Sequence, residues 1–426
     1  MTAPRLRWSI GALLGAGVLV NYFDRISLSV AGPQLQIEFG LGPAGMGLLF
    51  SAFFWSYALL QIPSGLLLDR FGVTRIGRWC TLLWAVASTL TACAGGFAGV
   101  FLARMLLGVA EAPSFPANAK AIGHWFGRDE RALSTALFDA AAKFSNVIGV
   151  PLVALAVVRF GWRWGFALVA LLSFGYCVAF WRWYRDPSRH ARLSPEEHAR
   201  ILRAGAVPEG VHPAGAGALL AALLRSRDVW GATIGFAAYG YGFYLFLTWL
   251  PGYLVQVMHM GVLKSATFTA VPWACATVTD LLVGGWLIDW LIRRGHDASR
   301  VRKLVLLSGM GCGLAVFGAT TTTDPVIAIT WISLSLGGLA AAAPVCWSLP
   351  ALIAPAGGAG TVGGIMNFAN NLMGAIAPIA TGLLVGATQS FTPASDWFHH
   401  SLGALSASLP ASIRLSGGNG MSVWMS

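Results

Sequence analysis

Seven ionisable residues interrupt long apolar stretches of this chain. They are Asp24, Arg25, Arg104, Glu111, Asp139, Lys143 and Asp280. A charged side chain inside a membrane span costs at least about 2.5–3.5 kcal/mol on insertion scales, so its first interpretation is a role in binding protons, ions or charged solutes. The alternative is that these charges pair with one another and fix the packing of helices.

Four of these residues form two close pairs in the sequence. Asp24 and Arg25 are adjacent, and Arg104 and Glu111 are seven residues apart, which places the latter two on one face of a helix. The planar guanidinium of an arginine suits a carboxylate. A buried aspartate or glutamate gains or loses a proton when its solvation or its distance from a cation changes. Residues of these types are able to bind an anion and to exchange a proton.

The composition indicates which elements hold these residues. Of the 426 residues, 56% are hydrophobic and 11% are charged, whereas soluble domains have about 25% charged residues. A helix that crosses a bilayer needs about 20 apolar residues. The predicted spans are 8–31, 44–68, 77–95, 97–121, 132–158, 162–184, 229–257, 266–292, 303–321, 326–354 and 359–387. The sequence therefore predicts an all-α, multi-pass membrane protein.

The basic residues follow the topology of these spans. When the spans alternate in direction, most loop arginines and lysines fall on one side, together with the N-terminus and the segment 185–228. Such asymmetry predicts that this side is cytoplasmic and that the protein lies in the inner membrane of the cell. The net charge of +11 is thereby explained without a nucleic-acid partner.

The polar segment 185–228 divides the chain. It separates an N-terminal half, 1–184, with six predicted helices from a C-terminal half, 229–390, with five, and a polar tail, 391–426, follows. Within the segment, Ser194, Pro195 and Glu197 form the pattern of a capping box, which predicts a short helix. Two related helical halves are typical of a transporter whose site lies at their interface.

Several motifs resemble a known family. The stretch "GLLLDRFGVTRIGR", with Gly65, Asp69, Arg70 and Gly72, resembles the cytoplasmic loop motif of the major facilitator superfamily. "NYFDRISLSVAGP", "FLARMLLGVAEAPSFPANAKAIGHWF", "FLTWLPGYL" and "GGIMNFANNLMGAIAP" resemble its anion:cation symporter branch, which includes bacterial galactonate, glucarate and hexuronate carriers and animal sialin. This resemblance implies two pseudo-symmetric six-helix halves that alternate access to a central site, with the loop motif controlling the conformational change.

The resemblance also implies roles for the charged residues. Spans one, four, seven and ten line the cavity in that family, so Asp24 and Arg25 would face Arg104 and Glu111. By the same resemblance, Asp24 and Glu111 carry the coupled protons and Arg25 meets the carboxylate of the substrate. Arg104 would hold one of the carboxylates ionised until the proton arrives.

Neutral residues are assigned to the same site by resemblance. Tyr22, Tyr57, Trp347, Ser348 and Asn367 match positions that line the sugar-acid site in relatives. Packing or anchoring at the membrane interface is the alternative for the aromatic ones.

Four residues depart from the sugar-acid pattern. Lys143 replaces a neutral polar residue, and it either offers a second cation to a dicarboxylate or pairs with Asp139 one turn away. Asp280 is either an additional proton site or a partner for Lys143. Asn370 and Asn371 add amides where small residues are usual, which leaves the identity of the anion open.

The tail also departs from the family pattern of twelve spans. After residue 390 no apolar run is long enough to cross a bilayer. Either an altered reading frame or an eleven-span variant accounts for this, so the twelfth helix is expected to be missing or altered.

The predicted function is proton-coupled import of a sugar acid or another small carboxylate. A carrier of a tartrate-like or aromatic carboxylate and a passive anion channel are the alternatives. Span seven, 229–257, contains no charged residue, which disfavours a phosphate antiporter. No catalytic motif is present, and the six cysteines are scattered singly, so no enzyme activity, metal site or cofactor is expected. We expect a monomer in the bilayer.

Overall fold

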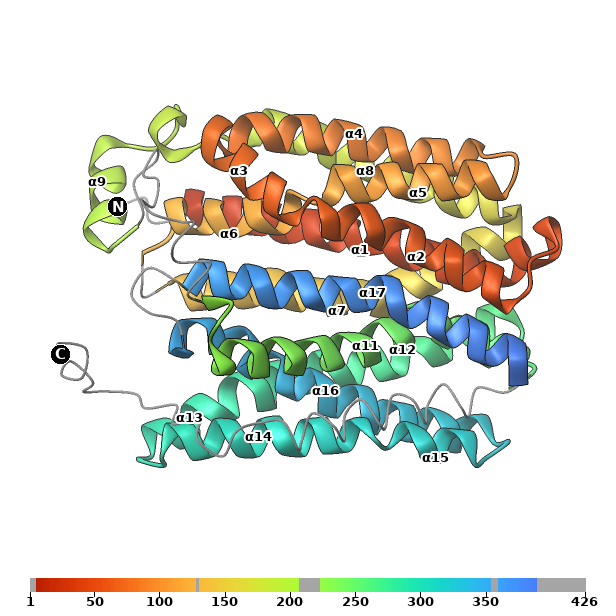
Figure 1. The fold of residues 1–426 in the computed structure, drawn as a ribbon. Helices are drawn as coiled ribbons and strands as arrows, with labels where there is room; N and C mark the ends of the chain where they lie inside the picture. Colours follow the sequence, from red (N-terminus) through yellow and green to blue (C-terminus); the bar gives the residue numbers. More distant parts are fainter. Residues whose placement is uncertain (1–4, 128–129, 207–222, 354–358, 389–426) are drawn as a thin grey trace. The chain divides into compact units, whose positions relative to one another are not determined.

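The structure is a computed structural model that describes residues 5–127, 130–206, 223–353 and 359–388. These residues form helices and no strands (Figure 1). The predicted tail, 391–426, and part of the segment 185–228 lie outside the described residues, as does the side chain of Asp69.

The first half of the chain forms nine α-helices and a short 3-10 helix. They are α1 (Arg5–Phe39), α2 (Pro43–Leu59), α3 (Gln61–Phe71), α4 (Val73–Cys93), α5 (Phe97–Glu111), α6 (Ser114–Trp125), α7 (Arg131–Phe160), α8 (Trp162–Trp183), η1 (Pro187–Arg189) and α9 (Pro195–Arg203).

Two of the predicted spans are interrupted in this half. The span at 44–68 is divided at Leu60 between α2 and α3, and the span at 97–121 is divided between α5 and α6. Pro113 explains the second break, because proline has no N–H to continue a helix and its ring clashes with the carbonyl group four residues earlier. The break makes Glu111 the last residue of α5.

The second half contains α11 (Arg227–Gln256) and the helices that follow it. They are α12 (Val262–Thr279), the π-helix η2 (Asp280–Leu287), α13 (Ile288–Arg293), α14 (Ala298–Gly313), α15 (Val316–Thr320), α16 (Pro325–Ile353) and α17 (Ala359–Thr388). The span predicted at 266–292 is thus continuous but changes to π geometry at Asp280, a feature that is frequent at functional sites.

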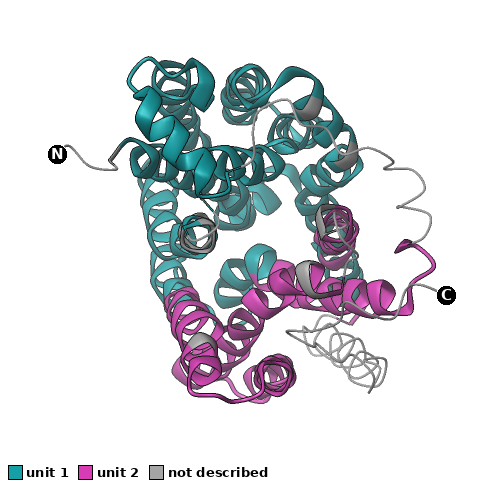
Figure 2. Ribbon diagram, turned by 90° about the vertical axis from the view of Figure 1, so that its left-hand side faces the viewer, with its two compact units in different colours: residues 1–212, 247–270, 378–386 teal, residues 213–246, 271–377, 387–426 magenta. Residues whose placement is uncertain are grey.

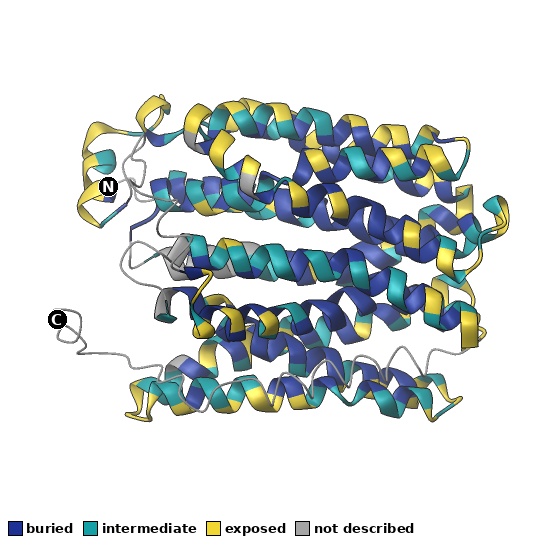
Figure 3. Ribbon diagram, viewed as in Figure 1, coloured by how far each residue is buried: buried dark blue, intermediate teal, exposed yellow. Residues whose placement is uncertain are grey.

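Eight helical segments of the described residues are long and apolar enough to cross a membrane. The predicted spans at 44–68, 77–95 and 229–257 are helical but are not among the eight, since the first is broken, α4 begins with two arginines, and α11 is rich in tyrosine and tryptophan. Many large apolar side chains are exposed, such as Leu102, Leu171 and Val178 (Figure 3). An exposed apolar surface of this extent suits lipid, and the chain is a multi-pass membrane protein.

The chain forms two compact units, which Figure 2 distinguishes by colour. Unit 1 comprises residues 1–212, 247–270 and 378–386, and unit 2 comprises residues 213–246, 271–377 and 387–426. The predicted boundary at 185–228 between two sequence halves stays a prediction.

Unit 1 is built around α1. This helix packs against α7 and α8, while α4 packs against α8 and α5, and α5 packs against α2. The contact between α5 and α2 needs a glycine, because a Cβ atom at Gly108 would lie 2.2 Å from Phe53 O and Ser56 Oγ. This close approach brings the polar face of α5 against the aromatic residues of α2.

Residues 185–206 of the segment 185–228 pack at one end of unit 1. Ser194 caps α9 by accepting a hydrogen bond from Glu197 N at 3.1 Å, as predicted, but the Glu197 carboxylate lies 3.5 Å from Arg7 Nη1. Arg7 also pairs with Glu130 at 2.6 Å, so α9, the start of α1 and the start of α7 share one ionic cluster. Burial lowers the pKa of His190, whose ring meets Trp125 edge-on, so this histidine is neutral at pH 7.

In unit 2, α16 is the central helix. It packs against α14, α15 and η2. Ser335 of α16 donates a hydrogen bond to Gly313 O at 2.6 Å, and Thr279 donates one to Gly337 O at 2.8 Å. Both bonds give buried hydroxyls a partner and fix the spacing of these helices.

Candidate functional site

Asp24 and Arg25 lie at the middle of α1 and are 1% and 6% exposed. Successive residues of a helix point about 100° apart, so the two side chains reach different neighbours. Arg25 points toward α2 and α5, and Asp24 points toward α4 and α8. The adjacent charges therefore belong to two separate polar clusters.

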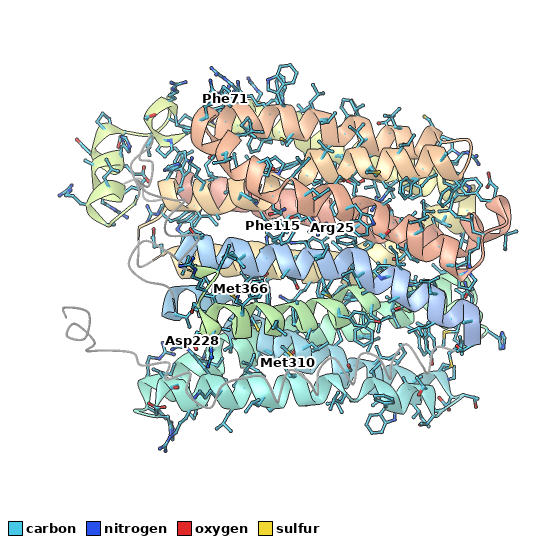
Figure 4. All side chains as sticks on the ribbon, viewed as in Figure 1. Arg25, Phe71, Phe115, Asp228, Met310 and Met366 are labelled. Atoms are coloured by element: carbon cyan, nitrogen blue, oxygen red, sulfur yellow. The ribbon has the colours of Figure 1, made fainter. Side chains whose placement is uncertain are left out.

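Arg25 lies in an aromatic enclosure of unit 1 (labelled in Figure 4). The centres of the Tyr22, Phe53 and Tyr57 rings lie 4.9, 4.7 and 4.8 Å from its Cζ atom. Cation–π contacts of this kind stabilise a guanidinium by about 0.5–2 kcal/mol each. These ring contacts hold the arginine in place.

Glu111 is the carboxylate that Arg25 meets. Nε and Nη2 of Arg25 lie 3.4 and 3.5 Å from Glu111 Oε2, and both side chains are buried. Glu111 Oε1 is also buried, and it has no hydrogen-bond partner among the described residues. Half of this carboxylate is thus held by a cation at long distance, and the other half is unsatisfied.

Arg104 takes a position that differs from the expected one. Its Nη1 donates a hydrogen bond of 2.7 Å to the main-chain oxygen of Asp24, whereas the expectation was an arginine that holds a carboxylate. Its Cζ atom lies 5.7 Å from the centre of the Phe53 ring. Arg104 and Glu111 lie on one face of α5, as expected, since both side chains are buried against α1 and α2.

The carboxylate of Asp24 accepts hydrogen bonds from three neutral donors among the described residues. Ser88 Oγ donates to Oδ1 at 2.6 Å, Ser173 Oγ donates to Oδ2 at 3.0 Å, and Trp84 Nε1 also donates to Oδ2. Both carboxylate oxygens are therefore satisfied, and hydrogen bonds to a charged acceptor contribute about 1.5–3 kcal/mol each. No sequence signal marked these three donors, because a serine or tryptophan inside a span resembles an ordinary packing residue.

Lys143 pairs with Asp139. The Nζ atom lies 2.8 Å from Asp139 Oδ2 one turn earlier on α7, as the spacing predicts. Lys143 is buried, whereas the Asp139 side chain is 24% exposed. This geometry favours the pairing interpretation of Lys143.

The predicted residues of unit 2 form smaller contacts. Trp347 is 43% exposed and packs edge-on against Phe236, and Ser348 donates to Val345 O at 2.7 Å. Asn367 accepts from Asn371 Nδ2 at 3.0 Å.

Two further polar residues of unit 2 are buried. Tyr244 donates to Asn371 Oδ1 at 2.9 Å, which extends the amide pair on α17 to α11. Asp280 is 4% exposed at the first residue of the π-helix. Unit 2 thus offers amides, a hydroxyl, an indole and a single buried carboxylate.

The loop motif lies where α3 ends and α4 begins. Gly72 has a φ of 78°, which favours glycine, and it joins the two helices in a tight turn. Arg70 is exposed beside the ring of Phe71, and Gly65 lies within α3. Asp69 belongs to α3, but its side chain lies outside the described residues.

No group of three or more His, Cys, Asp or Glu residues in the described part of the chain could hold a metal ion. The buried charged side chains described in unit 1 include Asp24, Arg25, Arg104, Glu111 and Lys143, and those described in unit 2 include Asp280. Such a set can bind anions and protons.

Comparison with known proteins agrees with this chemistry. The family model for the Major Facilitator Superfamily matches residues 14–378. The "Uncharacterized transporter YybO" of Bacillus subtilis (strain 168) is 42% identical over 387 residues, which cover 91% of this chain and 89% of that protein. The "Probable galactarate/D-glucarate transporter GudP" of Escherichia coli (strain K12) is 32% identical over 406 residues, with 91% and 89% coverage.

The fold has a solved counterpart. A bacterial homolog of the human lysosomal transporter Spinster, in an inward-facing and unoccupied conformation, matches with a TM-score of 0.73 at 18% identity, covering 96% of this chain and 93% of that one. The family and its relatives are transporters rather than enzymes. The predicted resemblance is confirmed, and this chain is a transporter that belongs to the Major Facilitator Superfamily.

Proposed function

We propose that this chain is a proton-coupled symporter that carries a small organic anion, foremost a sugar acid, into the cell by alternating access. The observation that carries the proposal is the pair formed by Arg25 and Glu111 inside an aromatic enclosure. An arginine that is shielded from water is a strong ligand for a carboxylate. In this structure Arg25 already pairs with a carboxylate of the protein, that of Glu111.

Proton binding at Glu111 would release Arg25 for the substrate. A protonated Glu111 no longer competes for the guanidinium, and a neutral carboxyl with an unpartnered oxygen costs less to bury than a carboxylate. By linkage, an anion that binds Arg25 must in turn tighten proton binding at Glu111. This reciprocity is the physical basis of symport in the proposal.

Asp24 would serve as the second proton site. Asp24 and Glu111 balance the charges of Arg25 and Arg104 when both carboxylates are ionised. Protonation of Glu111 leaves the charge of Arg25 uncompensated, which suits a carboxylate of the anion. In the proposal, Arg104 holds the backbone at Asp24 and completes the positive field around the site.

The substrate class rests on the relatives and on the neutral residues. GudP is described as a galactarate/D-glucarate transporter, and both of those anions are dicarboxylates with several hydroxyls. We assign Tyr22 and Tyr57 to the anion site beside Arg25. We assign Trp347, Ser348 and Asn367 to contacts with the polyol chain.

The setting of the carrier is also proposed. The basic loops support an N-terminus on the cytoplasmic side of the inner membrane, with Gly65, Asp69, Arg70 and Gly72 in a loop that controls the conformational change. Because one chain contains the whole charge set, the functional unit is a monomer. Reporter fusions at residue 4 and within 207–222 would test the orientation.

Uptake into proteoliposomes tests the function. The purified protein is given an inward proton gradient and a panel of labelled galactarate, D-glucarate, galactonate, tartrate and benzoate. We expect saturable accumulation of one sugar acid above its external concentration, abolished by a protonophore. Uptake that only equilibrates and is insensitive to the protonophore would identify a passive channel, and accumulation of tartrate or benzoate would identify one of the alternative substrate classes.

A further inference from the structure

Unit 1 contains a cavity of about 30 Å³ beside α1. Its wall is formed by residues of α1, α4, α6 and α8, among them Asn21, Trp84, Asn118 and Tyr176. A single water needs roughly 10–15 Å³ on such a measure, so the cavity has room for about two.

The polar group that faces this cavity is Asn21. Its side chain is 1% exposed, and neither the oxygen nor the nitrogen of its amide has a hydrogen-bond partner among the described residues. A buried amide without partners is costly, because it has lost its hydrogen bonds to solvent. A water molecule in the cavity would supply both a donor and an acceptor.

The cavity lies next to a residue that binds Asp24. Trp84 belongs to the cavity wall and also donates a hydrogen bond to the Asp24 carboxylate. Asn21 lies one turn before Asp24 on α1, and Ser173, which donates to Asp24, lies one turn before Tyr176 of the wall. Residues three apart on a helix share a face, so both turns lead from the carboxylate into the cavity.

The cavity extends toward one end of the unit. Its wall includes Val73, the first residue of α4, and Phe180, near the end of α8. In Figure 4, the wall residue Phe115 lies on the side of Arg25 that is nearer the N-terminus. From Trp84 to Val73 the rise of α4 is roughly 16 Å.

The charged residues around this route do not block the passage of protons, because each has a partner and none belongs to the cavity wall. Around Asp24, Arg104 binds the main-chain oxygen, and Arg25 pairs with Glu111. On α7, Lys143 pairs with Asp139. The cavity wall itself contains no Asp, Glu, Lys, Arg or His, and its titratable groups are Cys80 and Tyr176.

We propose that this cavity holds water that carries protons between Asp24 and the end of unit 1 at which α4 begins, by a route that the anion does not use. In the step, the O–H bond of the Asp24 carboxyl breaks and the proton passes to a cavity water. The carboxylate that remains keeps its hydrogen bonds from Trp84, Ser88 and Ser173. The route rests on the proposed function in one respect, namely that Asp24 carries a coupled proton.

The test compares Asn21→Leu with Asn146→Leu in proteoliposomes. Both asparagines are buried, but Asn146 lies on α7 and is not part of the cavity wall. Leucine has nearly the same size as asparagine and cannot hold a water. Two rates are measured: anion exchange at equal pH, and gradient-driven uptake with a pH dye in the lumen.

For Asn21→Leu we expect exchange to stay near the native rate while gradient-driven uptake and the accompanying proton flux fall by roughly 100-fold, the lower end of the effect of losing a positioned proton-transfer group, here the water that Asn21 binds. Asn146→Leu should retain both rates. Equal, native rates of proton-driven uptake in the two variants would overturn the proposal.

A second measurement covers the case in which Asn21→Leu does not fold. Hydroxyl-radical labelling of the native protein in membranes reports water beside individual side chains. Tyr176 should be oxidised well above Phe166, a buried residue of the same helix outside the cavity wall. Protection of Tyr176 equal to that of Phe166 would overturn the proposal. If native uptake ignored the proton gradient, the proposed function would fail, and this labelling would still decide whether the cavity holds water.

Discussion

The two buried carboxylates of unit 1 are held in opposite ways. Asp24 accepts hydrogen bonds at both oxygens from Trp84 and two serines, all neutral. Glu111 has one oxygen at 3.4 Å from a guanidinium and one with no partner in the described part of the chain.

Asp24 and Arg25 are adjacent in the sequence, which suggests one shared task. The difference between the two carboxylates instead separates binding of the anion from a response to protons alone. The state of Glu111 depends on Arg25, so an anion that binds Arg25 acts on it directly. The state of Asp24 depends on neutral donors, so it responds to protons without contact with the anion. The following predictions test this division, from the largest expected effect to the smallest.

Replacement of Arg25 by lysine should weaken binding of the anion, and this is the largest effect that we expect. Lysine keeps the charge but lacks the planar donor fork, and loss of a charge-assisted pair of hydrogen bonds at about 1.5–3 kcal/mol corresponds to roughly 10- to 100-fold weaker binding. Equilibrium binding of the transported anion measures this. Arg163→Lys, at an exposed arginine that pairs with Glu38, is the control and should bind normally.

Asp24→Asn should separate exchange from accumulation. The variant cannot release a proton at this position, but Arg25 and Glu111 remain in place, so we expect anion exchange to persist while accumulation against a gradient is lost. Counterflow and gradient-driven uptake in the same vesicles measure the two. Loss of both activities in a variant that is folded and stable would place Asp24 in the anion site.

Trp84→Phe should shift the pH dependence of uptake without abolishing it. The indole N–H can only donate, so it favours the ionised form of Asp24, and its removal lets the carboxyl keep its proton to higher pH. A hydrogen bond to a charged group is worth about 1.5–3 kcal/mol and about 1.36 kcal/mol is one pH unit, so the alkaline limb should move up by about one to two units. An unchanged limb in the pH profile would mean that the donors of Asp24 do not control it.

The double variant Asp139→Asn/Lys143→Gln should have the smallest effect. It removes both charges of the Asp139–Lys143 pair together, so neither charge is left without its partner, and uptake should stay within about threefold of native. The initial rate of uptake measures this, and Lys143→Gln alone should be less stable because it strands Asp139. A loss of uptake in the double variant as large as that of Arg25→Lys would make Lys143 a ligand of the anion.

Much of the fold could be predicted from the sequence. Length and hydropathy located the helices, and the motifs identified the superfamily, since both depend on patterns that are local in the chain. Local spacing also predicted the Ser194 cap and the pair of Asp139 with Lys143. Hydropathy did not reveal the break after Glu111, although Pro113 carried the signal for it.

The arrangement inside the site could be predicted only in part. The spacing of Arg104 and Glu111 gave their common face, but the direction of the Asp24 side chain depends on how α1 is rotated against α4 and α8. That rotation is set by packing, for which a single sequence has no local signal. The neutral partners of Asp24 could not be predicted for the same reason. Arg104 binds a main-chain oxygen, and no residue type in the sequence indicates such a partner.

The most direct test of the division between the two carboxylates is the affinity of the transported anion as a function of pH. It is measured between pH 5 and 8 by calorimetry on the purified native protein, Glu111→Gln and Asp24→Asn. We expect native binding to weaken as pH rises, Glu111→Gln to bind tightly at every pH, and Asp24→Asn to follow the native curve. If Glu111→Gln kept the native pH dependence and Asp24→Asn lost it, Glu111 would not be the proton site that competes with the anion for Arg25.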